Sequence, residues 1–160
     1  MGDIQIIPAV TGDHIAHARS LMIEYRDSIS TPLCFQGFDA EMLSLPGRYA
    51  GPTGSLLLAL DAATPVGCIA LREIGSGPLG RICEMKRLFV RPTHRRTGLG
   101  RRLASEIINE GRRLGYAAMR LDTDKAMAAA QGLYESLGFI PIDKYNDDPI
   151  PDTLFFELRL

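Results

Sequence analysis

An apolar segment, a basic glycine-rich segment and an amphipathic segment follow one another in the second half of the chain. The first, RICEMKRLFV (81–90), is typical of a buried strand, and the second, HRRTGLGRRL (94–103), places Gly98 and Gly100 among four arginines. From about residue 99 to 114, apolar side chains recur at helical spacing. This order predicts a strand joined by a glycine-rich loop to a helix that packs its apolar face on the sheet.

The other segments extend the same pattern over the whole chain, and neither a repeat nor a linker interrupts it. Thr11 is a good N-cap residue for the first helix, and Gly115 and Gly138 are placed to end two others. We predict strands at 3–9, 55–60, 66–74, 81–90, 117–123 and 153–160, and helices at 12–28, 40–45, 99–114 and 125–137. The result is a single domain, residues 1–160, with a mixed sheet and helices of the α/β or α+β class.

The distribution of charge points to a small anionic ligand. The net charge is −1, which argues against a nucleic-acid partner, yet seven of the 18 Lys and Arg residues lie between Lys86 and Arg102. A local cationic patch on a nearly neutral protein suits one small anion better than a long polyanion.

Several function classes find no support in the sequence. No apolar run is long enough to span a membrane, and the first residues lack the pattern of a secretory signal, so we expect a cytoplasmic protein. Three cysteines without a paired spacing are expected to be reduced core residues. We also expect no metal, because the cysteines and histidines are scattered: Cys34, Cys68, Cys83, His14, His17 and His94.

Two glycine-rich segments compete as phosphate-binding loops. Gly75, Gly77 and Gly80 spell G-x-G-x-x-G, but a strand follows them where a dinucleotide site needs a helix, so we predict a hairpin turn. Arg95-x-x-Gly98-x-Gly100 instead opens a helix, whose free amides and dipole attract anions. On chemistry alone, a pyrophosphate site and a solvated loop remain equally open for this second segment.

Two motifs resemble those of the GNAT family of acyl-CoA-dependent N-acyltransferases. RLFVRPTHRRTGLGRRLASEII matches the Arg/Gln-x-x-Gly-x-Gly/Ala signature, and a second signature, Leu-Tyr-x-x-x-Gly-Phe, is matched by Leu133, Tyr134, Gly138 and Phe139. The middle of the chain also looks like a subgroup of small bacterial members. The resemblance implies a mixed, mostly antiparallel central sheet of six to seven strands flanked by about four helices. It also implies an N-acetyltransferase that uses acetyl-CoA; family members often form homodimers, which the sequence leaves open.

The resemblance also assigns the coenzyme site. The pyrophosphate would lie on the glycine-rich loop, which comprises Arg95, Arg96, Thr97, Gly98, Leu99, Gly100 and Arg101. Leu88, Phe89 and Val90 would offer backbone groups to the pantetheine arm, where their strand splays from 117–123. Relatives often carry Asn where this chain has Met127, so one contact to the pantetheine is in doubt.

Glu84 is the candidate base and Tyr134 the candidate acid. Glu84 lies eleven residues before Arg95, at the offset of a catalytic glutamate in the histone-modifying branch of the family, and a carboxylate is uncommon in a strand. Alternatively, Glu84 only orders water or forms an ion pair with Lys86 or Arg87. The resemblance places the Tyr134 hydroxyl near the sulfur, where it can protonate the leaving thiolate; the alternative is a packing role.

The acceptor is expected across the sheet from the coenzyme. Candidate contacts are Tyr25, Arg26, Gln36 and Tyr49, with Arg26 suited to a carboxylate. Asp147, Asp148 and Asp152 would favour a cationic amine, unless they only form a solvated turn. We predict acetyl transfer to the primary amine of a small molecule, such as an amino acid or an amine metabolite. The alternatives are a protein N-terminus or lysine as acceptor, and a non-catalytic acyl-CoA-binding module.

Overall fold

The computed structural model describes residues 2–29 and 37–160, which form one seven-stranded sheet in the order β1-β2-β3-β4-β5-β7-β6. The strands are β1 (Ile4–Pro8), β2 (Ser55–Asp61), β3 (Thr64–Gly77), β4 (Gly80–Val90), β5 (Ala118–Asp124), β6 (Ile140–Ile142) and β7 (Thr153–Arg159). The α-helices of the described part are α1 (Gly12–Ser28), α2 (Phe38–Ser44), α3 (Leu99–Arg113) and α4 (Ala128–Ser136). β4 and β5 are parallel, and the other neighbouring strands pair antiparallel. The predicted fold class is confirmed.

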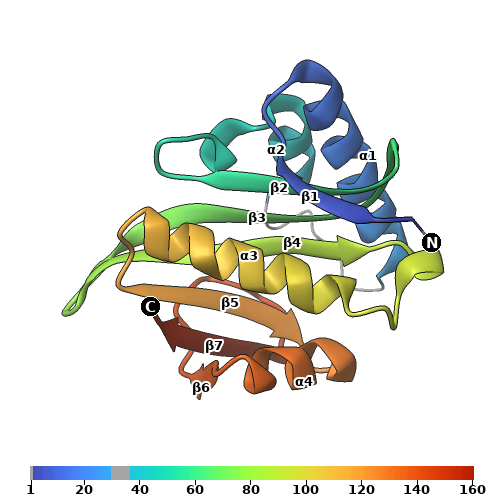
Figure 1. Cartoon of the computed structure of the whole chain (residues 1–160). Coiled ribbons are helices and arrows are strands. Elements are labelled where there is room, and N and C mark those ends of the chain that lie inside the picture. Colours follow the sequence, from blue (N-terminus) through green and yellow to red (C-terminus); the bar gives the residue numbers. More distant parts are fainter. Residues whose placement is uncertain (1, 30–36) are drawn as a thin grey trace.

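Each face of the sheet carries its own hydrophobic core. On one face, α3 packs on β3 and β4, and its residues Leu103 and Ile107 are fully buried. On the other face, α1 and α2 pack on the sheet, with Leu21 and Phe38 at the centre of the second core. Figure 1 shows α3 in front of the strands and α1 and α2 behind them. Side chains alternate between the faces along a strand, so β2 supplies both cores from neighbouring residues.

A bulge in β4 changes which side chains face each core. Cys68 of β3 pairs with Phe89, but Ala70 pairs with Lys86, so β4 contains an extra residue at this point. Arg87 adopts the left-handed backbone conformation there, with φ of 61°. As a result, both Lys86 and Arg87 avoid the α3 core, and Phe89 joins the core under α1.

β4 and β5 part shortly after they meet. They pair at only three positions, between residues 82–84 and 118–120. Beyond Glu84 the two strands have no further registered pair in the described part of the chain, although both continue. The expected splay is therefore present, and it exposes backbone groups of β4 along its last residues.

Most element boundaries agree with the sequence-based expectations to within a few residues. Thr11 caps α1 as expected, by accepting a hydrogen bond from the His14 amide at 3.2 Å. The segment Gly75–Gly80 forms the hairpin between β3 and β4, as expected, with Gly77 paired to Gly80. The three-residue strand β6 was not predicted, because its sequence, IPI, is too short to show alternation.

One helix differs from its prediction in a way that matters for the site. α4 begins at Ala128 rather than near 125, and Ala126 and Ala129 are exposed, although the pattern placed them inward. Both line a groove instead of the core. Their apolar surface is therefore available to a ligand.

Candidate functional site: a groove and a pocket at the splayed strands

The glycine-rich loop ends in an uncapped helix N-terminus. Gly98 adopts a left-handed conformation, with φ of 85°, and provides no side-chain cap to α3. The first bond of α3 runs from the Arg102 amide to the Gly98 carbonyl at 3.0 Å, so the amides of residues 99–101 have no partner one turn earlier. An added Cβ at Gly100 would approach only Val90 and Leu133, at 3.9 and 4.0 Å. This end of α3 can therefore hold a phosphate against bare backbone.

A long groove runs from this loop along the splayed strands. It has a volume of about 1000 Å³ and is lined by the last residues of β4, by the end of β5 and by α4. Of the expected coenzyme contacts, the groove contains Leu88, Phe89, Val90, Arg95, Arg96, Gly98, Leu99 and Gly100. Thr97 and Arg101 do not line it: the Thr97 hydroxyl donates to the His94 carbonyl, and Arg101 donates to Ser136, each at 2.6 Å.

Two tyrosines enter the groove from opposite faces. Tyr134 of α4 is 8% exposed, packs edge-on against Phe139, and its hydroxyl has no hydrogen-bond partner within the described residues. Burial raises the pKa of Tyr134, so the hydroxyl keeps its proton well above neutral pH. Tyr25 of α1 lies against Phe89, and burial raises its pKa as well. Met127 also lines the groove, at the position where relatives often carry Asn.

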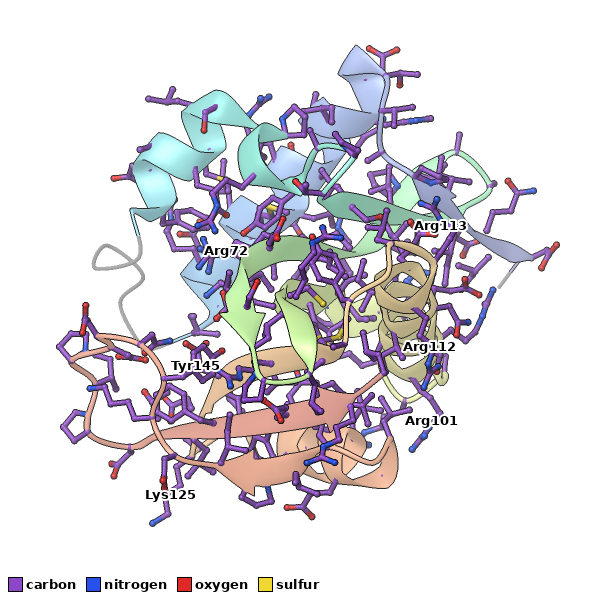
Figure 2. All side chains as sticks on the ribbon, turned by 90° about the vertical axis from the view of Figure 1, so that its left-hand side faces the viewer. Arg72, Arg101, Arg112, Arg113, Lys125 and Tyr145 are labelled. Atoms are coloured by element: carbon purple, nitrogen blue, oxygen red, sulfur yellow. The ribbon has the colours of Figure 1, made fainter. Side chains whose placement is uncertain are left out.

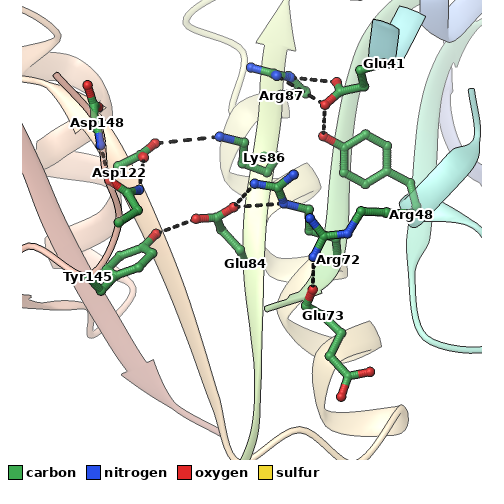
Figure 3. A network of polar contacts seen from close by, with 12 residues as sticks. Glu41, Arg48, Arg72, Glu73, Glu84, Lys86, Arg87, Asp122, Tyr145 and Asp148 are labelled. Atoms are coloured by element: carbon green, nitrogen blue, oxygen red, sulfur yellow. Dashed lines mark hydrogen bonds and ion pairs between the residues drawn. The ribbon is translucent and has the colours of Figure 1, made fainter. Parts of the chain in front are cut away.

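Glu84 does not line this groove. Its side chain is 2% exposed and lies in the floor of a smaller pocket of about 320 Å³, which is separate from the groove that contains Tyr134. Arg72 donates to one carboxylate oxygen of Glu84, from Nε at 3.0 Å and from Nη2 at 2.9 Å. The Tyr145 hydroxyl donates to the other oxygen at 2.6 Å (Figure 3). An ion pair of Glu84 is thus present, but with Arg72 rather than with Lys86 or Arg87.

Lys86 and Asp122 face each other where β4 and β5 part. The Lys86 ammonium lies 3.9 Å from one oxygen of Asp122, and the Asn146 amide donates to the other oxygen at 2.8 Å. Both charged side chains line the groove, and Lys86 is only 7% exposed. Burial lowers the pKa of Lys86, whereas the Asp122 carboxylate opposes that shift. Asn146 also lines the pocket of Glu84, so this contact lies between the groove and the pocket.

Arg87, next along β4, belongs to a buried structural network. Its guanidinium forms two hydrogen bonds to Glu41 of α2, at 2.9 and 3.2 Å, and stacks near the Phe38 ring. The Tyr49 hydroxyl donates to the same carboxylate at 2.9 Å. These contacts fix α2 to the bulge of β4.

We expect Glu41→Gln to destabilise the protein by about 1.5–3 kcal/mol, because the buried Arg87 would lose its ionic partner. Chemical denaturation of the variant and the wild type measures this difference. Tyr49→Phe, which removes only a neutral donor, is the matched control and should cost about 1 kcal/mol. Equal stability of Glu41→Gln and the wild type would contradict the structural role of this ion pair.

The candidate acceptor residues do not gather in one place. Tyr25 lines the groove, whereas Tyr49 is buried in the Glu41 network and reaches neither the groove nor the pocket. Arg26 pairs with Asp27 and Asp39 outside both cavities, and Gln36 lies outside the described residues.

The aspartates of the last loop are separated as well. Asp148 is 6% exposed and lines the groove, but its carboxylate caps the Ile150 amide at 2.8 Å, as expected of a turn residue. Asp147 and Asp152 are exposed and line neither cavity.

Sequence reasoning missed most of the smaller pocket. Its walls include Arg48, Arg72, Arg120, Tyr145 and Asn146, which come from four separate parts of the chain. Alternation along β3 and β5 places Arg72 and Arg120 on the face of Glu84, but only the strand order makes them neighbours. A residue-by-residue search for motifs has no access to that order.

A mixed sheet with a splayed parallel pair, a phosphate-binding helix end and a groove between them defines an acyl-CoA N-acyltransferase fold. The acetyltransferase (GNAT) family model matches residues 21–139. The chain belongs to this family and is an acetyl-CoA-dependent N-acetyltransferase.

Two relatives agree with this assignment, and a solved structure has a similar fold. An uncharacterised N-acetyltransferase of Schizosaccharomyces pombe is 38% identical over 143 residues, which cover 89% of this chain and 86% of the relative. An IAA acetyltransferase of Azospirillum brasilense is 38% identical over 114 residues, covering 69% of this chain and 71% of the relative. The crystal structure of an acetyltransferase from Streptococcus agalactiae has a similar fold, with a TM-score of 0.78 at 21% identity and 98% coverage of both chains.

The expectations for the cysteines and for membrane-spanning segments can be compared with the described part of the chain. Cys68 and Cys83 are free and buried, as expected, and burial raises the pKa of both thiols to about 12. Cys34 lies outside the described residues. Within residues 2–29 and 37–160, no helix is both long and apolar enough to cross a membrane.

Proposed function

We propose that this enzyme transfers the acetyl group of acetyl-CoA to the primary amine of a small molecule by direct attack. The observation that carries the proposal is the arrangement of the two cavities at the splay. The long groove suits the coenzyme, and the pocket of about 320 Å³ that adjoins it at Asn146 suits a small acceptor. The name of the Azospirillum relative, IAA acetyltransferase, is compatible with a small acceptor.

The glycine-rich loop would hold the pyrophosphate, and β4 would hold the pantetheine arm. The free amides of residues 99–101 and the arginines of the loop supply hydrogen bonds to phosphate oxygens. Leu88, Phe89 and Val90 face the gap left by β5, where their backbone groups can pair with the amides of the arm as a neighbouring strand would.

Tyr134 and Glu84 would handle the two protons of the reaction. The amine nitrogen attacks the thioester carbonyl, the carbon–sulfur bond breaks, and the thiolate takes the proton of the Tyr134 hydroxyl. The second proton that the nitrogen loses on becoming an amide would restore that hydroxyl. Glu84 would accept the proton of the ammonium group through a bound water, since three of its roughly four acceptor positions are already used by Arg72 and Tyr145. Tyr134 lines the groove and Glu84 lines the smaller pocket, so the two protons would move through different cavities.

The test combines a binding measurement with an acceptor screen. We expect acetyl-CoA to bind selectively in calorimetric titrations at two salt concentrations, with NADH and ATP as controls. At 100 times its dissociation constant, acetyl-CoA should add about 2.7 kcal/mol to the stability of the protein. Release of free thiol is then followed with small amines and with peptides that offer an N-terminus or a lysine.

Thiol release with small amines supports the proposal, and release with peptides alone would assign a protein acceptor instead. Binding of acetyl-CoA without thiol release from any acceptor would favour a non-catalytic acyl-CoA-binding module. If ATP binds as tightly as acetyl-CoA, the glycine-rich loop is a general anion site and not a coenzyme A site.

A further inference from the structure

The smaller pocket, called here the arginine pocket, gathers three guanidinium groups around one buried carboxylate. Arg48 comes from the turn before β2, Arg72 from β3 and Arg120 from β5. Glu84 lies in the floor, and Tyr145 and Asn146 form one wall. Figure 2 shows Arg72 and Tyr145 well apart from Arg101, Arg112 and Arg113, which project from α3.

The charges around the arginine pocket leave one positive charge in excess. Arg72 is neutralised by Glu84 at 2.9 Å, and Arg120 by Glu157 at 2.8 Å. Arg48 has no acidic partner in the described part of the chain, because its guanidinium donates only to the backbone carbonyl of Glu73. The Glu73 carboxylate is itself paired with Arg81 at 3.0 Å. A single monovalent anion would balance this excess.

Unused hydrogen-bond donors point to the same conclusion. Each guanidinium group offers five N–H donors. Arg72 uses two of its donors on Glu84, Arg120 uses one on Glu157, and Arg48 uses one on the Glu73 carbonyl. None of the three has a further hydrogen-bond partner among residues 2–29 and 37–160. Guanidinium groups bind planar carboxylates through two parallel hydrogen bonds, so this donor set suits a carboxylate.

The arginine pocket neighbours the groove across one hydrogen bond. Asn146 lines the arginine pocket and donates to Asp122, which lines the groove at the splay. On the groove side of the contact between Asn146 and Asp122, the acidic groups are Asp122 and Asp148. Lys86 pairs with Asp122. An ammonium group toward the groove and a carboxylate in the arginine pocket would each meet opposite charge.

We propose that the arginine pocket binds the carboxylate of the acceptor, so that the substrate class is a small amine that carries a carboxylate, as an amino acid does. This assignment rests on the proposed function for the amine end of the molecule. Arg48 is the specificity-determining residue, because it is the guanidinium without a carboxylate of its own.

The experiment compares matched acceptors and matched variants. A panel of amino acids is tested beside the amide and the decarboxylated amine of each, with saturating acetyl-CoA and thiol release as the signal. Arg48→Gln removes the unpaired charge from the pocket, and Arg112→Gln removes an exposed arginine from the far side of α3. The same acids and amides are titrated calorimetrically into the protein saturated with coenzyme A.

We expect the acids to exceed their amides in kcat/KM by about 10–100-fold, the range expected for one charge-assisted contact. Arg48→Gln should reduce that ratio toward one, chiefly by raising KM for the acids, and Arg112→Gln should leave it unchanged. The calorimetric preference for acids over amides should follow the same order.

Failure of the pocket and failure of the proposed function give different results. Equal turnover of acids and amides, or a ratio unaffected by Arg48→Gln, would overturn the carboxylate assignment while the transferase function stands. No turnover, but binding of acids that Arg48→Gln abolishes, would overturn the function and keep the pocket. Binding of neither acids nor amides at millimolar concentration would overturn the pocket, and preference for an aminophosphonate would replace carboxylate with phosphonate.

Discussion

Gly100→Val should weaken the binding of acetyl-CoA by about 100-fold without destabilising the protein, through the loss of one or two charge-assisted hydrogen bonds to the phosphates. Gly100 lies in the first turn of α3, where the nearest atoms to an added Cβ are 3.9 and 4.0 Å away. The fold therefore has room for an added Cβ at this position. The cost falls on a ligand that must approach the bare backbone at this point. Calorimetric titration measures the affinity, and thermal unfolding without ligand measures the stability.

Gly132→Val is the matched control for this substitution. Gly132 lies in α4, an added Cβ would meet nothing within 4 Å, and the residue does not line the groove. The same change of side chain in open helical surface should leave the affinity for acetyl-CoA intact. If both variants bind acetyl-CoA as the wild type does, the phosphates do not lie on the N-terminus of α3.

Tyr134→Phe should lower kcat by about 100- to 10,000-fold, the range that positioned acid catalysis contributes. The affinity for acetyl-CoA should change little. Phenylalanine keeps the edge-on contact with Phe139, and the lost hydroxyl has no partner in the described structure. Only the proton offered to the thiolate disappears. Steady-state kinetics with a separate binding titration separates the two effects.

The pH dependence of kcat is a second test of the role of Tyr134 as an acid. Because burial raises the pKa of Tyr134, the protonated and active form persists at higher pH than for an ordinary tyrosine. We expect no loss of kcat between about pH 7 and pH 9 from this group, whose unperturbed pKa is already about 10. An undiminished kcat in Tyr134→Phe would assign the residue to packing alone.

The place of the glycine-rich loop beside the groove could be predicted from the sequence, because the parts of this loop are local. The loop with Gly98 and Gly100 lies between a strand and a helix that the periodicity reveals, and the structure places both glycines in the groove. The exposed alanines of α4 show the limit of this reasoning. An apolar face predicts burial, but it does not distinguish a core from a groove.

The arginine pocket could not be predicted, because it depends on contacts between distant segments. Arg26 and Tyr49 were expected to contact the acceptor. In the structure each is held instead by an acidic residue, Arg26 by Asp27 and Tyr49 by Glu41. Arg72 and Arg120 flank Glu84 only because β3, β4 and β5 are adjacent in the sheet, and Arg48 reaches the same pocket from the turn at residues 47–49. The bulge at Arg87 adds a further obstacle, since it breaks the alternation from which a face is assigned.

The two cores separate the packing on one face of the sheet from the packing on the other, which matters for evolution and for engineering. Tyr134 of the groove packs in the core under α3, whereas Phe89 of the groove packs in the core under α1 and α2, on the face that carries the arginine pocket. The two cores share strands but use alternate side chains of them. Residues of one core can therefore be exchanged while the packing of the other core is conserved.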